Sequence, residues 1–386
     1  MIKIVDIGYT ETNTPTAQSC NSYNRWLEEK LFYPLQYFGK RSYSDNNSDN
    51  NSDNNSDNNL DNNSHNKDKR LNLNYYFSEF ASALVFIFSY ADFQCLLNNY
   101  YKSYGRHHKF GAFALAFEGE DYHRYIKRHL NNITKFLVTC SNKHADYLLR
   151  TPPIYSVDSA TVLEKDLAYR ALSAKNYWFG KNSVLISKEH GSFFLIGSIL
   201  LPYKLNLEDL SKISDFVANG NQNNIEILSS PQGVDHFDGC KNCTICVDNC
   251  PTSAINKNEF ERTIDCTKCI SCQTIEVRRD HDVEKGNIFK KSAGYIFGCD
   301  LCQLVCPWNR QHLQLCLRSN SKALFDSIKQ SKYKIIHDFF LDEARNTDVV
   351  INDLHKLSNH GFEKMFQGTA LTRIGRQGII KNLKNI

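Results

Sequence analysis

Ten of the 14 cysteines of this 386-residue chain lie between positions 240 and 306. Seven of them form two dense motifs, Cys240-x2-Cys243-x2-Cys246-x3-Cys250-Pro251 and Cys299-x2-Cys302-x3-Cys306-Pro307. The other three lie between the motifs, at Cys266, Cys269 and Cys272. A segment so rich in cysteine folds around disulfides or around bound metal, and this choice constrains the rest of the fold.

The cellular compartment decides between disulfides and metal. The sequence begins MIKIVDIGYTETNT, with an early acidic residue and no apolar leader, so we expect a cytoplasmic protein without a signal peptide. The longest apolar run, residues 81–90, is too short to span a bilayer and predicts a buried strand. Because cytoplasmic thiols stay reduced, bound metal is the better explanation for the cysteines.

The first motif has the spacing of a bacterial ferredoxin. In that pattern three thiolates hold one [4Fe–4S] cluster, and the cysteine before proline holds the other cluster. Cys240, Cys243 and Cys246 would hold the first cluster here, and Cys250 would serve the second. Zinc sites more often use two separated CxxC pairs and do not need a cysteine before proline. The motif therefore predicts two clusters and not a zinc site.

The second motif lacks the first cysteine of the same pattern, which would fall at Ile296. The pairing rule assigns Cys306 to the first cluster. It assigns three ligands of the second cluster to Cys250, Cys299 and Cys302. The eighth ligand must come from outside both motifs, and the spacing leaves three candidates open: Cys266, Cys269 and Cys272.

The remainder of the chain predicts alternating helices and strands. Helical periodicity marks residues 20–40, 121–138 and 159–174, the last with Ser159 as N-cap. Residues 183–201 predict two strands joined by a turn at His190 and Gly191.

These patterns predict a chain of five parts. We expect an N-terminal helical part (1–43), a disordered Ser-Asp-Asn-Asn insertion (44–66), an α/β (α+β) domain (67–235), a two-cluster ferredoxin-like domain (236–316) and a helical tail (317–386). The net charge of +4 is too small to indicate a nucleic-acid partner by itself.

Several segments together resemble the epoxyqueuosine reductase family, which completes the tRNA nucleoside queuosine. The cluster region contributes CKNCTICVDNCPTSAI, CISCQTIE and IFGCDLCQLVCPWN. Similar segments are GEDYHRYIKRHL, YSVDSATVLEKDLAYRAL and WFGKNSVLISKEHGSFFLIGSIL upstream, and MFQGTALTRIGRQGIIKNLKNI at the end, so the resemblance covers roughly residues 68–386. It aligns the family's middle cysteine with Cys269, which implies Cys269 as the eighth ligand. Cys272 falls on a tyrosine position of the family, and Cys266 is additional.

The resemblance implies a cobalamin-binding reductase domain beside the cluster domain. Electrons from an external donor such as a flavodoxin or ferredoxin would pass through two [4Fe–4S] clusters to cobalamin. The epoxide of epoxyqueuosine in a tRNA anticodon loop would then be reduced to give queuosine. The implied cobalamin contacts are Arg70, Asp158, Asn182, Phe193 and Thr274.

Asp158 also falls on the position of the family's proton donor. A carboxyl group in that role must stay protonated near neutral pH, which a desolvated pocket achieves by raising its pKa. The alternative role for Asp158 is to cap the helix expected from about residue 160. Asp121 and His123 are further candidates for contact with cofactor or substrate.

The sequence departs from the family around the implied cobalamin pocket. Two glycines of the family are replaced by Lys175 and Tyr177, which we expect to crowd the approach to the corrinoid. Leu115 and Ala116 replace an Arg-Tyr pair.

These departures keep two rival functions open. One is an iron–sulfur electron-transfer protein with a degenerate corrinoid site, and the other is a corrinoid reductase of a small molecule. For tRNA, the expected phosphate contacts are Arg278, Arg279, Arg373, Arg376, Lys381 and Lys384. We expect a monomer that does not bind a membrane.

Overall fold

The computed structural model describes residues 2–11, 15–31, 70, 81–104, 108–140, 142–157, 162–221, 225–229, 237–257, 262–277, 290–315, 333–342 and 344–386. Predictions for the 44–66 insertion, Asp158, Ser159, Arg278 and Arg279 lie outside the described residues.

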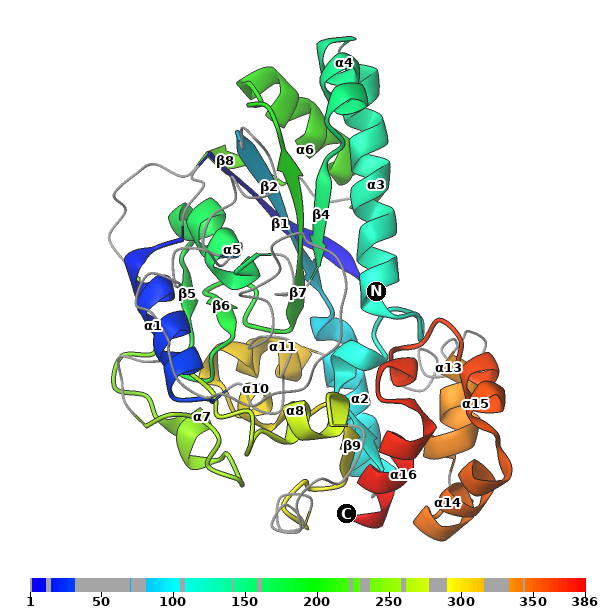
Figure 1. The fold of residues 1–386 in the computed structure, drawn as a ribbon. Helices are drawn as coiled ribbons and strands as arrows, with labels where there is room; N and C mark the ends of the chain where they lie inside the picture. Colours follow the sequence, from blue (N-terminus) through cyan, green and yellow to red (C-terminus); the bar gives the residue numbers. More distant parts are fainter. Residues whose placement is uncertain are drawn as a thin grey trace, which may run out of the picture.

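A five-stranded sheet in the order β4-β7-β2-β1-β8 forms the centre of the N-terminal half (Figure 1). Its strands are β1 (Lys3–Thr10), β2 (Ser82–Ser89), β4 (Ile154–Val157), β7 (Phe194–Leu201) and β8 (Leu228–Ser229). Neighbouring strands are antiparallel except for β1 and β8, which are parallel. The architecture is therefore a mixed α/β fold.

Strand β2 is buried on both faces, as its continuous apolar run predicts. Leu84, Phe86 and Phe88 point into the larger core, and Val85 and Ile87 point into a second core on the opposite face. The helices α3 (Tyr122–Cys140) and α6 (Leu207–Asn221) pack against the sheet at the larger core, and α5 (Glu164–Leu172) packs against it at the second. Covering both faces removes the need for alternating polar residues along the strand.

Two predictions about the N-terminal half need correction. The expected helical N-terminal part begins with a strand, because β1 pairs with β2 and buries Ile4, Ile7 and Tyr9. Lys3–Thr10 therefore belongs to the sheet domain and not to a separate helical part, although α1 (Ala17–Glu28) is helical as expected. Helix α5 begins at Glu164, several residues after the position expected from periodicity.

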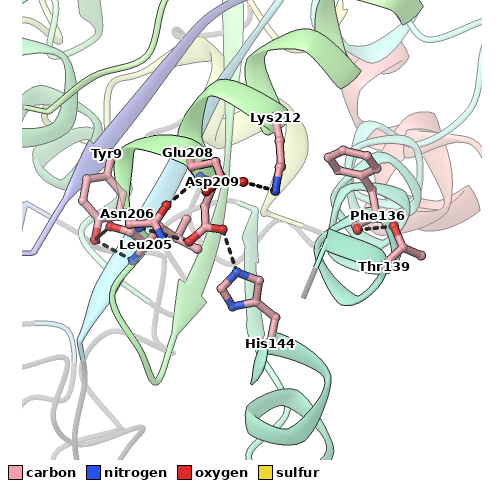
Figure 2. Close-up of polar contacts among 9 residues, drawn as sticks. All are labelled: Tyr9, Phe136, Thr139, His144, Leu205, Asn206, Glu208, Asp209 and Lys212. Carbon is pink, nitrogen blue, oxygen red and sulfur yellow. Dashed lines mark hydrogen bonds and ion pairs between the residues drawn. The ribbon is translucent and has the colours of Figure 1, made fainter. Parts of the chain in front are cut away.

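A polar contact connects α4 (Asn142–Arg150) to α6, as Figure 2 shows. His144, in α4, shares a hydrogen bond of 2.9 Å between its Nε2 and Oδ1 of Asp209. Asn206 and Asp209 each accept a hydrogen bond from the other's backbone N–H, which forms a capping box at the start of α6. Both oxygens of the buried Asp209 carboxylate are thereby hydrogen-bonded.

The cysteine-rich segment consists of short elements, as predicted. They are α7 (Ile245–Asp248), α8 (Ile270–Ile275), β9 (Tyr295–Phe297), α10 (Leu301–Leu304), η7 (Pro307–Asn309) and α11 (Arg310–Leu315). Elements of the sheet domain contact this segment. Helix α2 (Ala91–Tyr104) packs on α11, and strand β3 (Lys109–Phe110) pairs with β9. Strands β5 (Tyr177–Phe179) and β6 (Leu185–Ser187) form a hairpin, and its Trp178 and Ile186 pack with Cys306.

The C-terminal tail is helical in its described part. Its elements are α13 (Tyr333–Ile336), η9 (His337–Leu341), α14 (Thr347–Lys356), α15 (Asn359–Met365), η10 (Ala370–Arg373) and α16 (Gly375–Lys384), and α16 packs against α8 and β9. Within the described ranges, no helix combines the length and apolar character needed to cross a bilayer.

A turn at Gly191 joins the sheet domain to the cluster segment. Gly191 has a φ of +64°, and the next residue, Ser192, donates its N–H to Oδ1 of Asn309 at 2.8 Å. The Ser192 hydroxyl donates to Oε1 of Gln303 at 3.0 Å. A Cβ at position 191 would lie 2.1 Å from Oδ1 of Asn309, so only glycine fits this contact.

We predict that Gly191→Ala destabilises the protein by about 1–3 kcal/mol, because it combines backbone strain with a clash against Asn309. Gly220→Ala is the matched control, since Gly220 lies in α6 with open space around it, and alanine there stabilises a helix by about 0.5–1 kcal/mol. Thermal unfolding of the two variants checks this. Equal melting temperatures would contradict the role of the turn.

Candidate functional site

The four thiols predicted for the first cluster lie together. Burial, followed by the neighbouring Cys240, Cys306 and Cys243, raises the pKa of Cys246 to about 11. Burial, with Cys240 and Cys243, also raises the pKa of Cys306 to about 11. Cys306 therefore sits among the thiols of the first motif, as the pairing rule predicts, although ligation itself stays a prediction.

The thiols predicted for the second cluster also lie near one another. Burial raises the pKa of Cys302 most, and the nearby Cys269, Cys246 and Cys250 raise it further. Burial likewise raises the pKa of Cys299, to which Cys302 and Cys269 contribute. Of the three open candidates, Cys269 faces this set. The two sets meet where Cys302 approaches Cys246.

Thiols with raised pKa values are neutral at pH 7, so they become ligands only when a cation stabilises the thiolates. In the described part of the chain, no three Cys, His, Asp or Glu side chains are arranged as they would be around a single metal ion. A [4Fe–4S] cluster makes a different demand, because each of its four cysteines binds a different iron. The chemistry of both donor sets fits such clusters.

Two tryptophans cover the first thiol set. Trp178 of β5 donates its indole N–H to the Cys240 sulfur at 3.4 Å, and Trp308 donates to the carbonyl oxygen of Gly239 at 3.1 Å. Their rings pack edge to face with centroids 4.9 Å apart. Sequence reasoning assigned no role to these residues, although both lie inside quoted motifs. Hydrogen bonds to cluster sulfurs affect reduction potential, so Trp178 belongs to the site.

A cavity of about 560 Å³ lies beside the second thiol set. Cys269, Cys299 and Cys302 line it, whereas the four thiols of the first set do not. Other lining residues come from α1, β7, α8 and the start of α5. The volume is within the range of cofactor and ligand sites, and three thiols of the second set would border a molecule bound there.

Asn182 gives this cavity a polar group without a partner. Its side chain is 1% exposed and lines the cavity, and neither polar atom of its amide has a hydrogen-bond partner in the described part of the chain. The amide lies next to Cys302, where it offsets part of the rise in pKa that burial causes. A buried amide in this situation fits a polar ligand in the cavity.

The other predicted cobalamin contacts are placed differently. Phe193 is fully buried in the larger core, and Thr274 is fully buried with its hydroxyl accepting from the N–H of Gly298. Arg70 is buried and donates to the hydroxyl of Tyr23, which lines the cavity. None of these three lines the cavity directly. Asp158 lies outside the described residues, but Leu163, which follows it in the chain, lines the cavity.

The expectation that Lys175 and Tyr177 crowd the pocket is wrong. Both side chains point to Asp6 of β1, with the Tyr177 hydroxyl donating at 2.9 Å and the Lys175 ammonium forming an ion pair. Burial alone raises the pKa of Asp6, but hydrogen bonds from His190, Lys175 and Tyr177 outweigh it and lower that pKa overall. Neither residue lines the cavity, so the loss of two glycines leaves it open.

Leu115 and Ala116 are likewise remote from the cavity. Both are buried in the larger core. Asp121 and His123 form a pair with each other, with 2.8 Å between His123 Nδ1 and Asp121 Oδ1, and the residue between them, Tyr122, lines the cavity in their place.

Several basic side chains of the C-terminal tail bond to other parts of the protein, whereas the sequence suggested that they contact tRNA phosphates. Arg373 lines the cavity, donating to the Tyr122 hydroxyl at 3.2 Å and to Glu276 at 3.0 Å. Lys381 is 6% exposed and donates to backbone carbonyls of α8 and Val277, so its assignment as a phosphate contact is wrong. Arg376 bonds Asn359 and the carbonyl of Leu354.

Residues 239–309 match the family model described as a 4Fe-4S double cluster binding domain. The chain therefore contains an iron–sulfur cluster-binding domain. Over a longer stretch of this chain, an epoxyqueuosine reductase from Cyclobacterium marinum is 31% identical across 291 residues, which are 75% of this chain and 73% of that protein. The chain belongs to the epoxyqueuosine reductase family.

Another relative shows the limits of the match. An epoxyqueuosine reductase from Francisella cf. novicida is 33% identical over 69% of this chain, but only 57% of that protein is covered. The chain thus spans little more than half the length of the first curated epoxyqueuosine reductases that it matches.

Solved epoxyqueuosine reductases have the same fold. The enzyme from Streptococcus thermophilus matches with a TM-score of 0.57 at 18% identity, over 98% of this chain and 76% of that one. A crystal structure of epoxyqueuosine reductase with a tRNA-Tyr epoxyqueuosine-modified stem loop matches with a TM-score of 0.52 at 16% identity, over 99% and 76% of the two chains.

We predict that Cys269→Ser lowers the iron content after anaerobic reconstitution from about eight irons per chain to about four or fewer, because one cluster loses a ligand. Cys272→Ser should retain the full amount, as should the control Cys140→Ser at the end of α3. Iron and sulfide analysis checks this. Full iron content in Cys269→Ser together with loss of iron in Cys272→Ser would show that Cys272, and not Cys269, is the ligand.

Proposed function

We propose that this chain is an epoxyqueuosine reductase that converts epoxyqueuosine in tRNA to queuosine. The observation that carries the proposal is the cavity bordered by three thiols of the second set, in a member of this family. The match to an epoxyqueuosine reductase crystallised with a modified tRNA stem loop supports tRNA as the partner.

The two thiol sets support a path for electrons through two [4Fe–4S] clusters. The loop that carries the first set exposes Lys241, Asn242 and Thr244, so an external donor of the flavodoxin or ferredoxin type could reach it. The sets approach each other at Cys246 and Cys302, and Cys302 borders the cavity. Electrons would therefore enter at the first set and leave at the second.

Cobalamin is the proposed cofactor of the cavity. The unpartnered, buried amide of Asn182 and the position of the second thiol set fit such a group, with Tyr23 and Arg70 behind one wall. Cobalamin, when bound, supplies a strongly reducing metal centre next to the substrate. The residues of the chain hold it, exclude water and supply the proton.

Asp158 is the proposed proton donor. The net reaction consumes two electrons and two protons, breaks both carbon–oxygen bonds of the epoxide, and releases an alkene and water. The departing oxygen needs a proton from a nearby acid. The segment after Asp158 reaches the cavity at Leu163 and Glu164, which supports placing the acid there.

Recognition of tRNA would combine the cavity with the surface around it. Arg373 and Tyr122 line the cavity and are connected by a hydrogen bond, so they are placed to meet the nucleoside that enters. Arg376, Lys384, Arg278 and Arg279 remain the proposed phosphate contacts. We propose that the protein acts as a cytoplasmic monomer.

No observation now favours the two rival functions. The strongest argument for a plain electron-transfer protein was the replacement of two glycines by Lys175 and Tyr177, and both side chains point away from the cavity to Asp6. A small-molecule corrinoid reductase would not account for likeness to an epoxyqueuosine reductase over 291 residues, far more than the cluster domain at 239–309.

The test is turnover of tRNA that carries epoxyqueuosine by protein reconstituted anaerobically with iron, sulfide and cobalamin. We expect queuosine in the digested tRNA, measured by mass spectrometry of nucleosides. Asp158→Asn should lower turnover by about 10²–10⁴-fold with cobalamin still bound, because a general acid contributes that much. Asp146→Asn, on the exposed side of α4, is the control. Unchanged turnover in Asp158→Asn would refute the proton-donor role.

A further inference from the structure

Two cysteines that neither thiol set uses lie in contact with each other. The Sγ atoms of Cys266 and Cys272 are 3.2 Å apart, with Cys272 donating its S–H to Cys266. A disulfide has an S–S distance of about 2.05 Å, so the two sulfurs need to approach by only about 1.2 Å, which side-chain rotation can supply. Cys266 precedes α8, and Cys272 lies within it.

Neither cysteine is placed as a ligand of the second set. The thiols that act on Cys299 and Cys302 include Cys269 but not Cys266 or Cys272. Cys272 interacts with Cys266 and with Cys269, and burial together with these two neighbours raises its pKa well above the usual value. Cys272 therefore lies beside a predicted cluster ligand, and its direct thiol partner is Cys266.

The pair is accessible from the cavity and attached to its wall. Cys266 and Cys272 both line the cavity. They pack in an apolar cluster with Tyr23, Trp26 and Leu27 of α1, and Trp26 donates its indole N–H to the carbonyl of Ile264 at 2.9 Å. A small oxidant that enters the cavity can thus reach two thiols that are already in contact.

We propose that Cys266 and Cys272 form a reversible intramolecular disulfide, with a low-molecular-weight disulfide such as oxidised glutathione as the oxidant. One thiol attacks the oxidant as its thiolate, releasing one small thiol, and the other then displaces the second small thiol. The two cysteines lose two electrons and two protons, and the oxidant gains them as two thiols. In a reducing compartment such a disulfide is a redox-sensing modification and not a structural one.

The test uses the iron-loaded full-length protein, incubated anaerobically in glutathione buffers of increasing oxidised fraction. Free thiols are then blocked in acid and the protein is digested with trypsin. Cleavage after Arg262, Lys268 and Arg278 places Cys266 in peptide 263–268 and Cys272 in peptide 269–278. We expect these two peptides to become joined through Cys272, to separate on reduction, and to remain separate in Cys272→Ser.

Three outcomes would overturn the proposal. They are the absence of joined peptides at every glutathione ratio, a link through Cys269 that persists in Cys272→Ser, and loss of iron in both Cys266→Ser and Cys272→Ser, which would make these cysteines ligands. The readout is peptide mass and iron content, so it does not depend on turnover of tRNA.

Discussion

The fold interleaves the thiols of two short cysteine motifs, so that each predicted cluster draws on both motifs. Cys306 ends the second motif but lies among the thiols of the first, and Cys250 ends the first motif but lies near Cys302 of the second. Neither motif completes a set of four alone, so the two motifs must fold against each other. The turn at Gly191, held by Asn309 directly after the second motif, then brings the sheet domain onto the same unit.

Burial of these thiols couples folding of the segment to its clusters. Burial raises the pKa of Cys246, Cys299, Cys302 and Cys306, so these four thiols are neutral without iron. Binding of iron would release their protons and would supply part of the stability of the segment. The same arrangement gives the two sets different surroundings. Trp178 covers the first, and the cavity that contains Asn182 opens beside the second. The division supports entry of electrons on one side and their use on the other.

The sequence predicted features that depend on local pattern, namely the buried strand at 81–90, the amphipathic helix at 121–138 and the grouping of cysteines by spacing. It failed where a distant contact decides the outcome. The partner of Lys175 and Tyr177 is Asp6, about 170 positions away, and no local pattern indicates it. Lys381 resembled a surface lysine because its acceptors, the carbonyls of Gln273 and Val277, become neighbours only when α16 packs against α8. Strand β1 is as long as β2, but Asp6 and Gly8 interrupt its apolar residues, so no continuous apolar run indicates it.

We propose that the cavity beside the second thiol set holds a corrinoid. The direct measurement is a titration of cobalamin into the anaerobically reconstituted, iron-loaded protein, followed by absorption and electron paramagnetic resonance spectroscopy. We expect one cobalamin bound per chain, with binding weakened in Asn182→Leu because the amide that faces the cavity is lost. Full iron loading with no bound cobalamin at any concentration would contradict it and favour a protein that only transfers electrons.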